Sequence, residues 1–141
     1  IGAVTQITMS AMDDWGAEIV EKDAPVLVIL EGLTMYLNQA DIRQIFAVIA
    51  QRFPKVTVLA ETMNPTMARR FKEKSIEGSR AKFTFGVKDG KTFAALLPGF
   101  RYAGEHCLTE GMAVFVPIYR LLHKIPATRD LSNRIVVLER G

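Results

Sequence analysis

The chain has 141 residues, of which 49% are hydrophobic and 23% charged. This balance excludes long disordered segments and indicates a single globular domain over residues 1–141. The net charge is +3, with basic residues spread along the sequence, so no basic stripe predicts binding to nucleic acid. The only cysteine, Cys107, excludes an internal disulfide, and no ligand cluster predicts a metal site. The longest aliphatic run is too short for a membrane span, and we expect a cytoplasmic protein.

Apolar periodicity, caps and breakers predict an alternation of strands and helices. The region after residue 87 allows two structures, a helix capped by Asp89 or a hairpin turning at Asp89 and Gly90. In chain order, the other expected elements are a strand at 6–9, a polar turn at 10–15, a helix at 15–22, strands at 26–30 and 56–60 flanking a helix that ends at Arg52, a helix at 66–74, an extended segment at 82–87, a strand at 100–107, a helix at 112–124 broken near Pro117, and a strand at 134–138.

The strand–helix–strand unit near the middle of the chain has the clearest pattern. Residues 26–30 are five consecutive aliphatic residues, which is typical of a strand buried on both faces. Asn38 and Asp41 mark the start of a helix, and apolar side chains then recur at helical spacing. Because the connections are short, we expect the strands at 26–30 and 56–60 to be parallel and joined by a crossover helix.

Glu31 is the first candidate for ligand binding. It directly follows the strand at 26–30, and ligands of open α/β sheets bind beyond the carboxyl ends of the strands. A carboxylate there needs a partner, which could be a cationic ligand group such as an ammonium, or the N–H groups of the next helix. The ligand hypothesis requires Glu31 to lie at the tip of a buried central strand, facing a cleft shared with the turn at Ser10.

Two segments resemble a known family. Residues 25–37 contain Pro25 and the run Glu-Gly-Leu-x-Met-Tyr-Leu that starts at Glu31, and they resemble the signature after the fourth strand of leucine carboxyl methyltransferase-like enzymes. The turn at 10–15, with its tryptophan, is similar to the polyketide O-methyltransferase branch of that family, the tetracenomycin type. The resemblance implies an α/β fold, the C-terminal half of a Rossmann-like class I methyltransferase sheet with flanking helices, in which the last strand pairs antiparallel.

The resemblance also implies a cofactor and a reaction. The cofactor is S-adenosylmethionine, with Glu31 on its amino-acid portion and Ser10 and Ala11 beside its adenine. The reaction is methyl transfer to an oxygen of a small, polyketide-like molecule or of a carboxylate. The alternative is a non-catalytic interaction module that keeps the fold and forms homodimers through an exposed sheet edge.

One departure from the family pattern concerns the cofactor loop. The sequence has no Gly-x-Gly motif and begins at Ile1 without Met. We therefore expect a partial methyltransferase domain that lacks the N-terminal glycine-rich loop, binds the cofactor poorly and is inactive alone.

The catalytic residues remain unassigned by the sequence. His106 and His123 are candidates for a general base by residue type only, and the alternative interpretation is that they are structural or solvated residues. Cys107 adjoins His106, but neighbours on a strand point to opposite faces, so we do not expect them to pair. Met35 and Tyr36 could line the pocket, and packing of the following helix is the alternative interpretation.

Overall fold

A four-stranded mixed sheet forms the centre of the computed structural model, which describes residues 3–19, 24–71, 81–122 and 124–141. β1 and β2 are parallel, whereas β4 is antiparallel to both of its neighbours, β2 and β3. The parallel pair and the antiparallel last strand are therefore confirmed, and the carboxyl ends of β1, β2 and β3 lie at one edge. In the spatial order β1-β2-β4-β3, the strands are β1 (Val26–Leu30), β2 (Val56–Thr62), β4 (Arg134–Arg140) and β3 (Arg101–Cys107).

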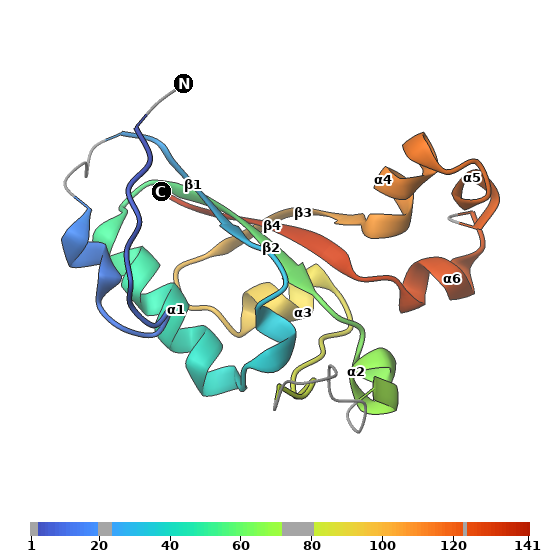
Figure 1. Ribbon diagram of the computed structural model, residues 1–141, viewed down its shortest axis with the longest axis horizontal. Helices are drawn as coiled ribbons and strands as arrows, with labels where there is room; N and C mark the ends of the chain where they lie inside the picture. Colours follow the sequence, from blue (N-terminus) through green and yellow to red (C-terminus); the bar gives the residue numbers. More distant parts are fainter. Residues whose placement is uncertain (1–2, 20–23, 72–80, 123) are drawn as a thin grey trace.

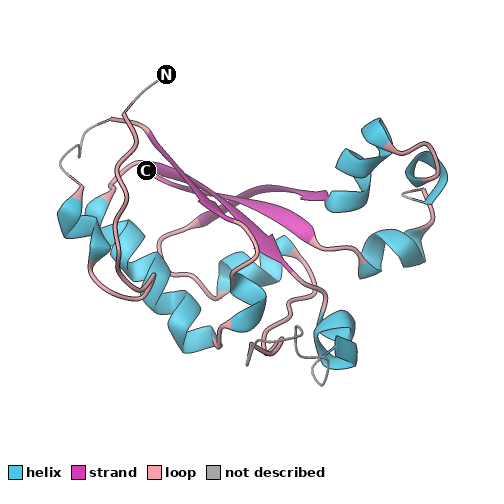
Figure 2. Ribbon diagram, viewed as in Figure 1, coloured by secondary structure: helices cyan, strands magenta, loops and turns pink. Residues whose placement is uncertain are grey.

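The helices fall into two groups. Figures 1 and 2 show α1 and α3 on the same side of the sheet, whereas α4, α5 and α6 lie together beyond the end of β3 and β4. The helical elements are η1 (Trp15–Glu18), η2 (Thr34–Tyr36), α1 (Gln39–Arg52), α2 (Pro65–Phe71), α3 (Gly90–Ala95), α4 (Leu108–Phe115), α5 (Tyr119–Leu122) and α6 (Pro126–Leu131).

Side-chain caps start the two helices that cover the sheet. At α1, the Asn38 side chain accepts from the N–H of Asp41 at 2.9 Å, and the Asp41 carboxylate accepts from the N–H of Asn38 at 3.3 Å. This reciprocal capping box satisfies two donors that a helix start otherwise leaves unpaired. At α3, the Asp89 carboxylate accepts from the N–H of Thr92 at 2.8 Å. The helix predicted after Asp89 is thus confirmed, and the hairpin alternative is wrong.

The main core lies between one face of the sheet and these helices. Val58, Val136 and Leu138 of the sheet are fully buried, and Phe93 of α3 is buried with them. Phe46 of α1 packs its ring edge-on against Phe93, with ring centroids 5.9 Å apart. Edge-to-face contact between large rings adds to the gain from burying their apolar area.

The opposite face of β1 is uncovered, which corrects the expectation for this strand. Leu27 is 57% exposed and Ile29 is 62% exposed, and burial alternates along β1. β1 is an edge strand of the four-stranded sheet, not a central strand buried on both faces. The helices that pack on the sheet cover only its other face (Figure 2).

Other boundaries also differ from the sequence predictions. Residues 6–9 form no strand, and the segment at 82–87 is irregular, with the Thr84 N–H donating to the carbonyl of Met35 at 2.8 Å. α4 begins at Leu108 and not at residue 112, the helical segment breaks near Pro117 as predicted, and α6 was not predicted. The predicted helix ends at 20–22 and 72–74, and His123, lie outside the described residues. None of the described helices combines the length and apolar character needed to cross a bilayer.

Candidate functional site at the carboxyl edge of the sheet

The carboxyl ends of β1, β2 and β3 bring several polar residues to one edge. Glu31 and Gly32 follow β1, and Asn133 immediately precedes β4 at the same edge. Near the end of β2 lies Glu61. This edge is where open α/β sheets bind their ligands, so it is the candidate site.

Glu61 joins the loop after β1 to the segment that precedes β4. Its Oε2 accepts from the N–H of Gly32 at 2.9 Å, and its Oε1 accepts from Nδ2 of Asn133 at 2.8 Å. The hydroxyl of Thr34, which is 1% exposed, donates to the backbone carbonyl of Glu61. Because charged acceptors make strong hydrogen bonds, one carboxylate holds the loop after β1 against the start of β4.

Glu31 follows β1 as predicted, but its surroundings differ from the expectation. The residue is exposed, and its strand lies at the edge of the sheet. Among the described residues, the Glu31 carboxylate has no hydrogen bond or ion pair. The hypothesis required Glu31 to lie at the tip of a buried central strand, and this requirement is wrong for the described structure. Glu31 therefore does not support the methyltransferase assignment, and its contact with a cofactor stays a prediction from the family resemblance.

The turn at Ser10 and Ala11 closes on itself. The Ser10 N–H donates to Oδ2 of Asp13 at 3.0 Å, and the Ser10 hydroxyl accepts from the N–H of Met12 at 3.3 Å. The carbonyl of Ala11 accepts from the indole N–H of Trp15 at 3.0 Å. Within the described part of the chain, no hydrogen bond or ion pair joins this turn to Glu31, and the adenine contact stays a prediction.

A polar pocket of about 390 Å³ lies at the carboxyl edge between β3, β4 and α3. Arg134 donates to Glu105 at 2.7 Å and contacts Asp130 at 3.4 Å. Glu105 also accepts from the N–H of Gly90 at 2.5 Å. With Asp89, the pocket has three carboxylates around Arg134 and Lys88, so it is poorly suited to a further anion.

A second pocket at this edge, of about 430 Å³, lies among α4, α6 and the start of β4. Its lining is mainly apolar and includes Leu108, Met112 and Leu131. Asn133 lines it too, so the hydrogen bond of Asn133 with Glu61 connects this pocket to the loop after β1.

The sequence predicted that Cys107 and His106 do not pair as nucleophile and base, and the strand register agrees with this prediction. His106 lies opposite Ile135 and Cys107 opposite Arg134 in the ladder, so their side chains leave opposite faces of the sheet. His106 is exposed, and its Nδ1 lies 3.6 Å from Oε2 of Glu110. Cys107 is buried, and this burial raises the pKa of its thiol above the ordinary value, which disfavours the nucleophilic thiolate.

Met35 and Tyr36 have packing roles. Met35 is 3% exposed and belongs to a small cluster with Met63 and Ala68. The ring of Tyr36 stacks on Phe83, with centroids 5.0 Å apart. A packing role is therefore confirmed for these two residues, but their partners lie after β2, in α2 and at residue 83, and not in the following helix α1.

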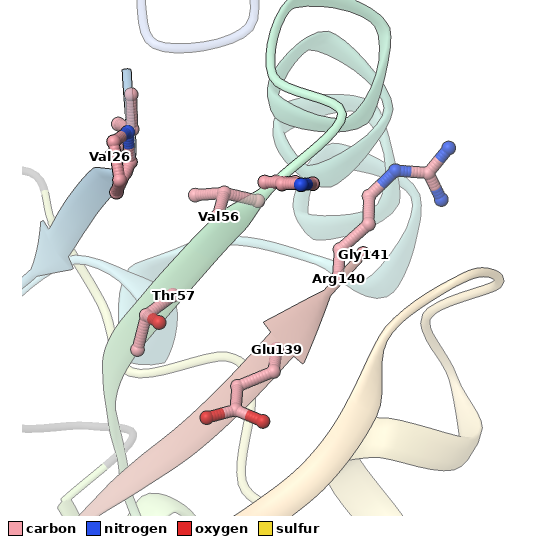
Figure 3. Close-up of a pocket in the computed structure, with 8 residues that line it drawn as sticks. Val26, Val56, Thr57, Glu139, Arg140 and Gly141 are labelled. Atoms are coloured by element: carbon pink, nitrogen blue, oxygen red, sulfur yellow. The ribbon is translucent and has the colours of Figure 1, made fainter. Parts of the chain in front are cut away.

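A pocket of about 380 Å³ lies at the opposite edge of the sheet. Figure 3 shows the residues that line it. The pocket is lined by Val26 and Val56 at the amino ends of β1 and β2, and by Glu139 and Arg140 near the end of β4. Because ligands of open α/β sheets bind at the carboxyl ends of the strands, this pocket is not the candidate site.

The sequence interpretation missed Glu61 and Asn133. The same signal that selected Glu31, a carboxylate next to a buried strand, also marks Glu61. Its partners Gly32 and Asn133 are 29 and 72 residues away in sequence, and no local pattern marks Asn133.

Comparison with curated proteins relates the chain to the O-methyltransferases. A similar protein is the tetracenomycin polyketide synthesis O-methyltransferase TcmP of Streptomyces glaucescens, which is 28% identical over 99 residues, or 70% of this chain. The aligned region is 36% of TcmP, so the chain spans little more than a third of that relative. No family model matches the chain, and no solved structure matches it. The similarity supports a methyltransferase relationship at a coarse level.

Proposed function

We propose that this chain is part of a Rossmann-like, S-adenosylmethionine-dependent O-methyltransferase that acts on a small, polyketide-like molecule. The observation that carries the proposal is the similarity to TcmP over 70% of the chain. The sheet is compatible with it, because the last strand lies antiparallel between two strands of the opposite direction, as the family resemblance implies. The membership in the leucine carboxyl methyltransferase-like family belongs to the same proposal.

The described residues can form one wall of a cofactor site. When bound, S-adenosylmethionine would supply an electrophilic methyl group for transfer to an acceptor oxygen, and Glu31 is the described residue that would hold its ammonium. The contact between the Glu31 carboxylate and the cofactor's ammonium is proposed from the family resemblance alone, because Glu31 is exposed and follows an edge strand. The loop that bears Glu31 is held in position by Glu61.

The 141-residue chain alone should bind the cofactor weakly, because it has no glycine-rich loop to hold the ribose and methionine portions. Isothermal titration of the chain with S-adenosylmethionine should therefore show no binding in the micromolar range. Micromolar binding by this chain would contradict the proposal that the missing loop supplies most of the site.

The decisive test concerns the reading frame upstream of Ile1. We expect it to encode a strand, a glycine-rich loop and a helix. In the protein produced from that longer frame, Glu31→Gln should raise the KM for S-adenosylmethionine at least about tenfold, because a charged hydrogen bond to the ammonium is lost. Glu18→Gln, at an exposed position in η1, is the matched control and should leave the KM unchanged. Equal KM values for both variants would remove Glu31 from the site.

The alternative function is a non-catalytic interaction module, and the edge position of β1 favours it. An edge strand offers unpaired backbone groups, and Leu27 and Ile29 add exposed apolar area. In this alternative, the chain forms homodimers through β1. Light scattering after size-exclusion chromatography should then give a dimer that Ile29→Lys dissociates. A monomer at high protein concentration would contradict the alternative.

A further inference from the structure

A second exposed apolar surface, besides the open face of β1, lies on α4 and α5. Six large apolar side chains between residues 114 and 125 are exposed, and Phe115 is the most exposed of them at 85%. These six residues form what we call the α4–α5 patch: Val114, Phe115, Val116, Ile118, Leu121 and Ile125. Large exposed apolar patches on soluble proteins mark interaction sites, because contact with water is unfavourable for them.

Short turns hold the α4–α5 patch together. α4 ends at Phe115, and the Val116 N–H donates to the carbonyl of Met112 at 2.8 Å. The chain then turns tightly, with the Leu121 N–H donating to the carbonyl of Ile118 at 3.1 Å. Figure 1 shows α4 and α5 at the end of the molecule away from the two termini. The patch is therefore one compact surface at that end of the molecule.

The charges beside the patch have one sign. Three exposed basic residues lie within or just after it in sequence: Arg120, Lys124 and Arg129. Residues 111–129 contain no aspartate or glutamate. The bordering acids, Glu110 and Asp130, contact basic side chains outside this stretch, at 3.6 and 3.4 Å. The three cations form no ion pair with any described residue, so the patch complements an anionic surface.

A second copy of the chain is a poor occupant of the α4–α5 patch. A twofold interface places the same surface of two copies face to face. Three cations from each copy would then approach one another, and residues 111–129 offer no carboxylate to pair with them. The charge of the patch therefore favours an anionic partner over self-association.

Among anionic partners, the protruding side chains favour a lipid surface. Phe115, Val114 and Leu121 are 85%, 70% and 63% exposed, so they stand out from the fold. A protein partner would need a pocket shaped to each of these side chains, whereas lipid acyl chains accommodate them in any arrangement. Lysine and arginine can contact the phosphates of anionic headgroups while neighbouring apolar side chains enter the acyl boundary.

We propose that the α4–α5 patch, together with Arg120, Lys124 and Arg129, binds peripherally to membranes that contain anionic lipids. Phe115 and the apolar residues beside it enter the acyl boundary, and the three cations contact headgroup phosphates. The inference does not depend on the proposed methyl transfer. Binding can be measured on the 141-residue chain without a cofactor.

The test is co-sedimentation of the chain with vesicles of phosphatidylcholine alone and with vesicles of equal parts phosphatidylcholine and phosphatidylglycerol. The chain should bind the phosphatidylglycerol vesicles at least about tenfold more tightly, because each cation near an anionic surface adds to the affinity. Raising NaCl from about 0.1 M to about 0.5 M should weaken this binding at least about threefold, since salt screens exposed charges. Equal binding to both kinds of vesicle, or binding to neither, would overturn the proposal.

Variants locate the contact, and each replaces an exposed side chain. Phe115→Ser should weaken binding to phosphatidylglycerol vesicles at least about fivefold, because the most exposed apolar side chain is lost. Ile29→Ser removes an exposed apolar side chain from β1 and is the matched control. Lys124→Gln combined with Arg129→Gln should weaken binding at least about tenfold. Lys55→Gln, at the opposite edge of the sheet, should change binding less than about twofold. Equal losses in variants and controls would overturn the assignment of the patch.

Three further measurements test the other occupants. Light scattering that gives a dimer of the chain, dissociated by Phe115→Ser, would make the patch an interface between copies and overturn the proposal. Binding to soluble poly-L-glutamate that is lost in Phe115→Ser, without binding to vesicles, would indicate an acidic protein partner instead.

The longer protein separates this inference from the proposed function. If that protein transfers no methyl group and still binds phosphatidylglycerol vesicles through Phe115, the proposed function fails and the membrane contact stands. If it transfers methyl groups and has lost the vesicle binding of the 141-residue chain, the segment before Ile1 covers the patch, and the membrane contact fails while the proposed function stands.

Discussion

Replacing Glu61 tests whether one carboxylate holds the candidate site together. Glu61→Ala removes the acceptor of two hydrogen bonds, from the Gly32 N–H at 2.9 Å and from Asn133 Nδ2 at 2.8 Å. Hydrogen bonds to charged groups contribute about 1.5–3 kcal/mol each when buried. Gly32 is exposed, so water can replace much of its bond, whereas Asn133 is half-buried. We therefore expect a loss of about 2 kcal/mol in the free energy of unfolding.

Urea unfolding measures this loss, and hydrogen exchange locates it. The amide of Gly32 should exchange faster in Glu61→Ala, because its acceptor is gone. Glu18→Ala changes an exposed carboxylate in η1 and should cost less than about 0.5 kcal/mol. If Glu61→Ala lowered the free energy of unfolding no more than this control, and the Gly32 amide exchanged at an unchanged rate, the Glu61 carboxylate would not hold the loop after β1 to the start of β4.

Three further predictions concern the folded chain. Asp89→Ala should lower the free energy of unfolding by about 1 kcal/mol near neutral pH, because the side-chain cap of α3 is lost. The hydrogen bond from the Thr92 N–H holds the pKa of Asp89 below its ordinary value. The stabilisation by Asp89 is therefore complete above pH about 4 and is lost as the pH falls through the folded-state pKa. Urea unfolding across this pH range measures the loss, and Asp89→Asn, which caps the helix without titrating, is the control. Cys107 should react with iodoacetamide at pH about 8 at least about tenfold more slowly in the folded chain than in urea, because burial raises the pKa of its thiol; equal rates would contradict that burial. Phe46→Ala should cost about 3–5 kcal/mol, since the ring is 2% exposed and packs on Phe93 and Phe100; a loss below about 1 kcal/mol in urea unfolding would place Phe46 outside the core.

The elements that the sequence predicted well are those specified by local chemistry. α1 follows from Asn38, Asp41 and apolar residues at helical spacing, all within the helix and its cap. The break between α4 and α5 follows from Pro117, which lacks the N–H that a continuous helix requires. α6 had a local signal too, because Pro126 occupies a first-turn position that suits proline, but no side-chain cap precedes it.

The features that could not be predicted depend on distant partners. Burial of β1 depends on what covers each face of the sheet, and a run of aliphatic residues does not reveal that Leu27 and Ile29 face solvent. Likewise, the bonds of Glu61 join residues brought together only by the β-sheet pairing. Glu31 was located correctly at the end of a strand, whereas its exposure follows from the edge position of that strand.

The position of β4 in the sheet has a consequence for folding during synthesis. β4 is the last of the four described strands, yet it lies between β2 and β3 and is the strand that joins them. A nascent chain on the ribosome therefore exposes the facing edges of β2 and β3 until residues 134–140 have left the exit tunnel. During the interval in which β3 has emerged and β4 has not, both unpaired edges are open to pairing with other chains.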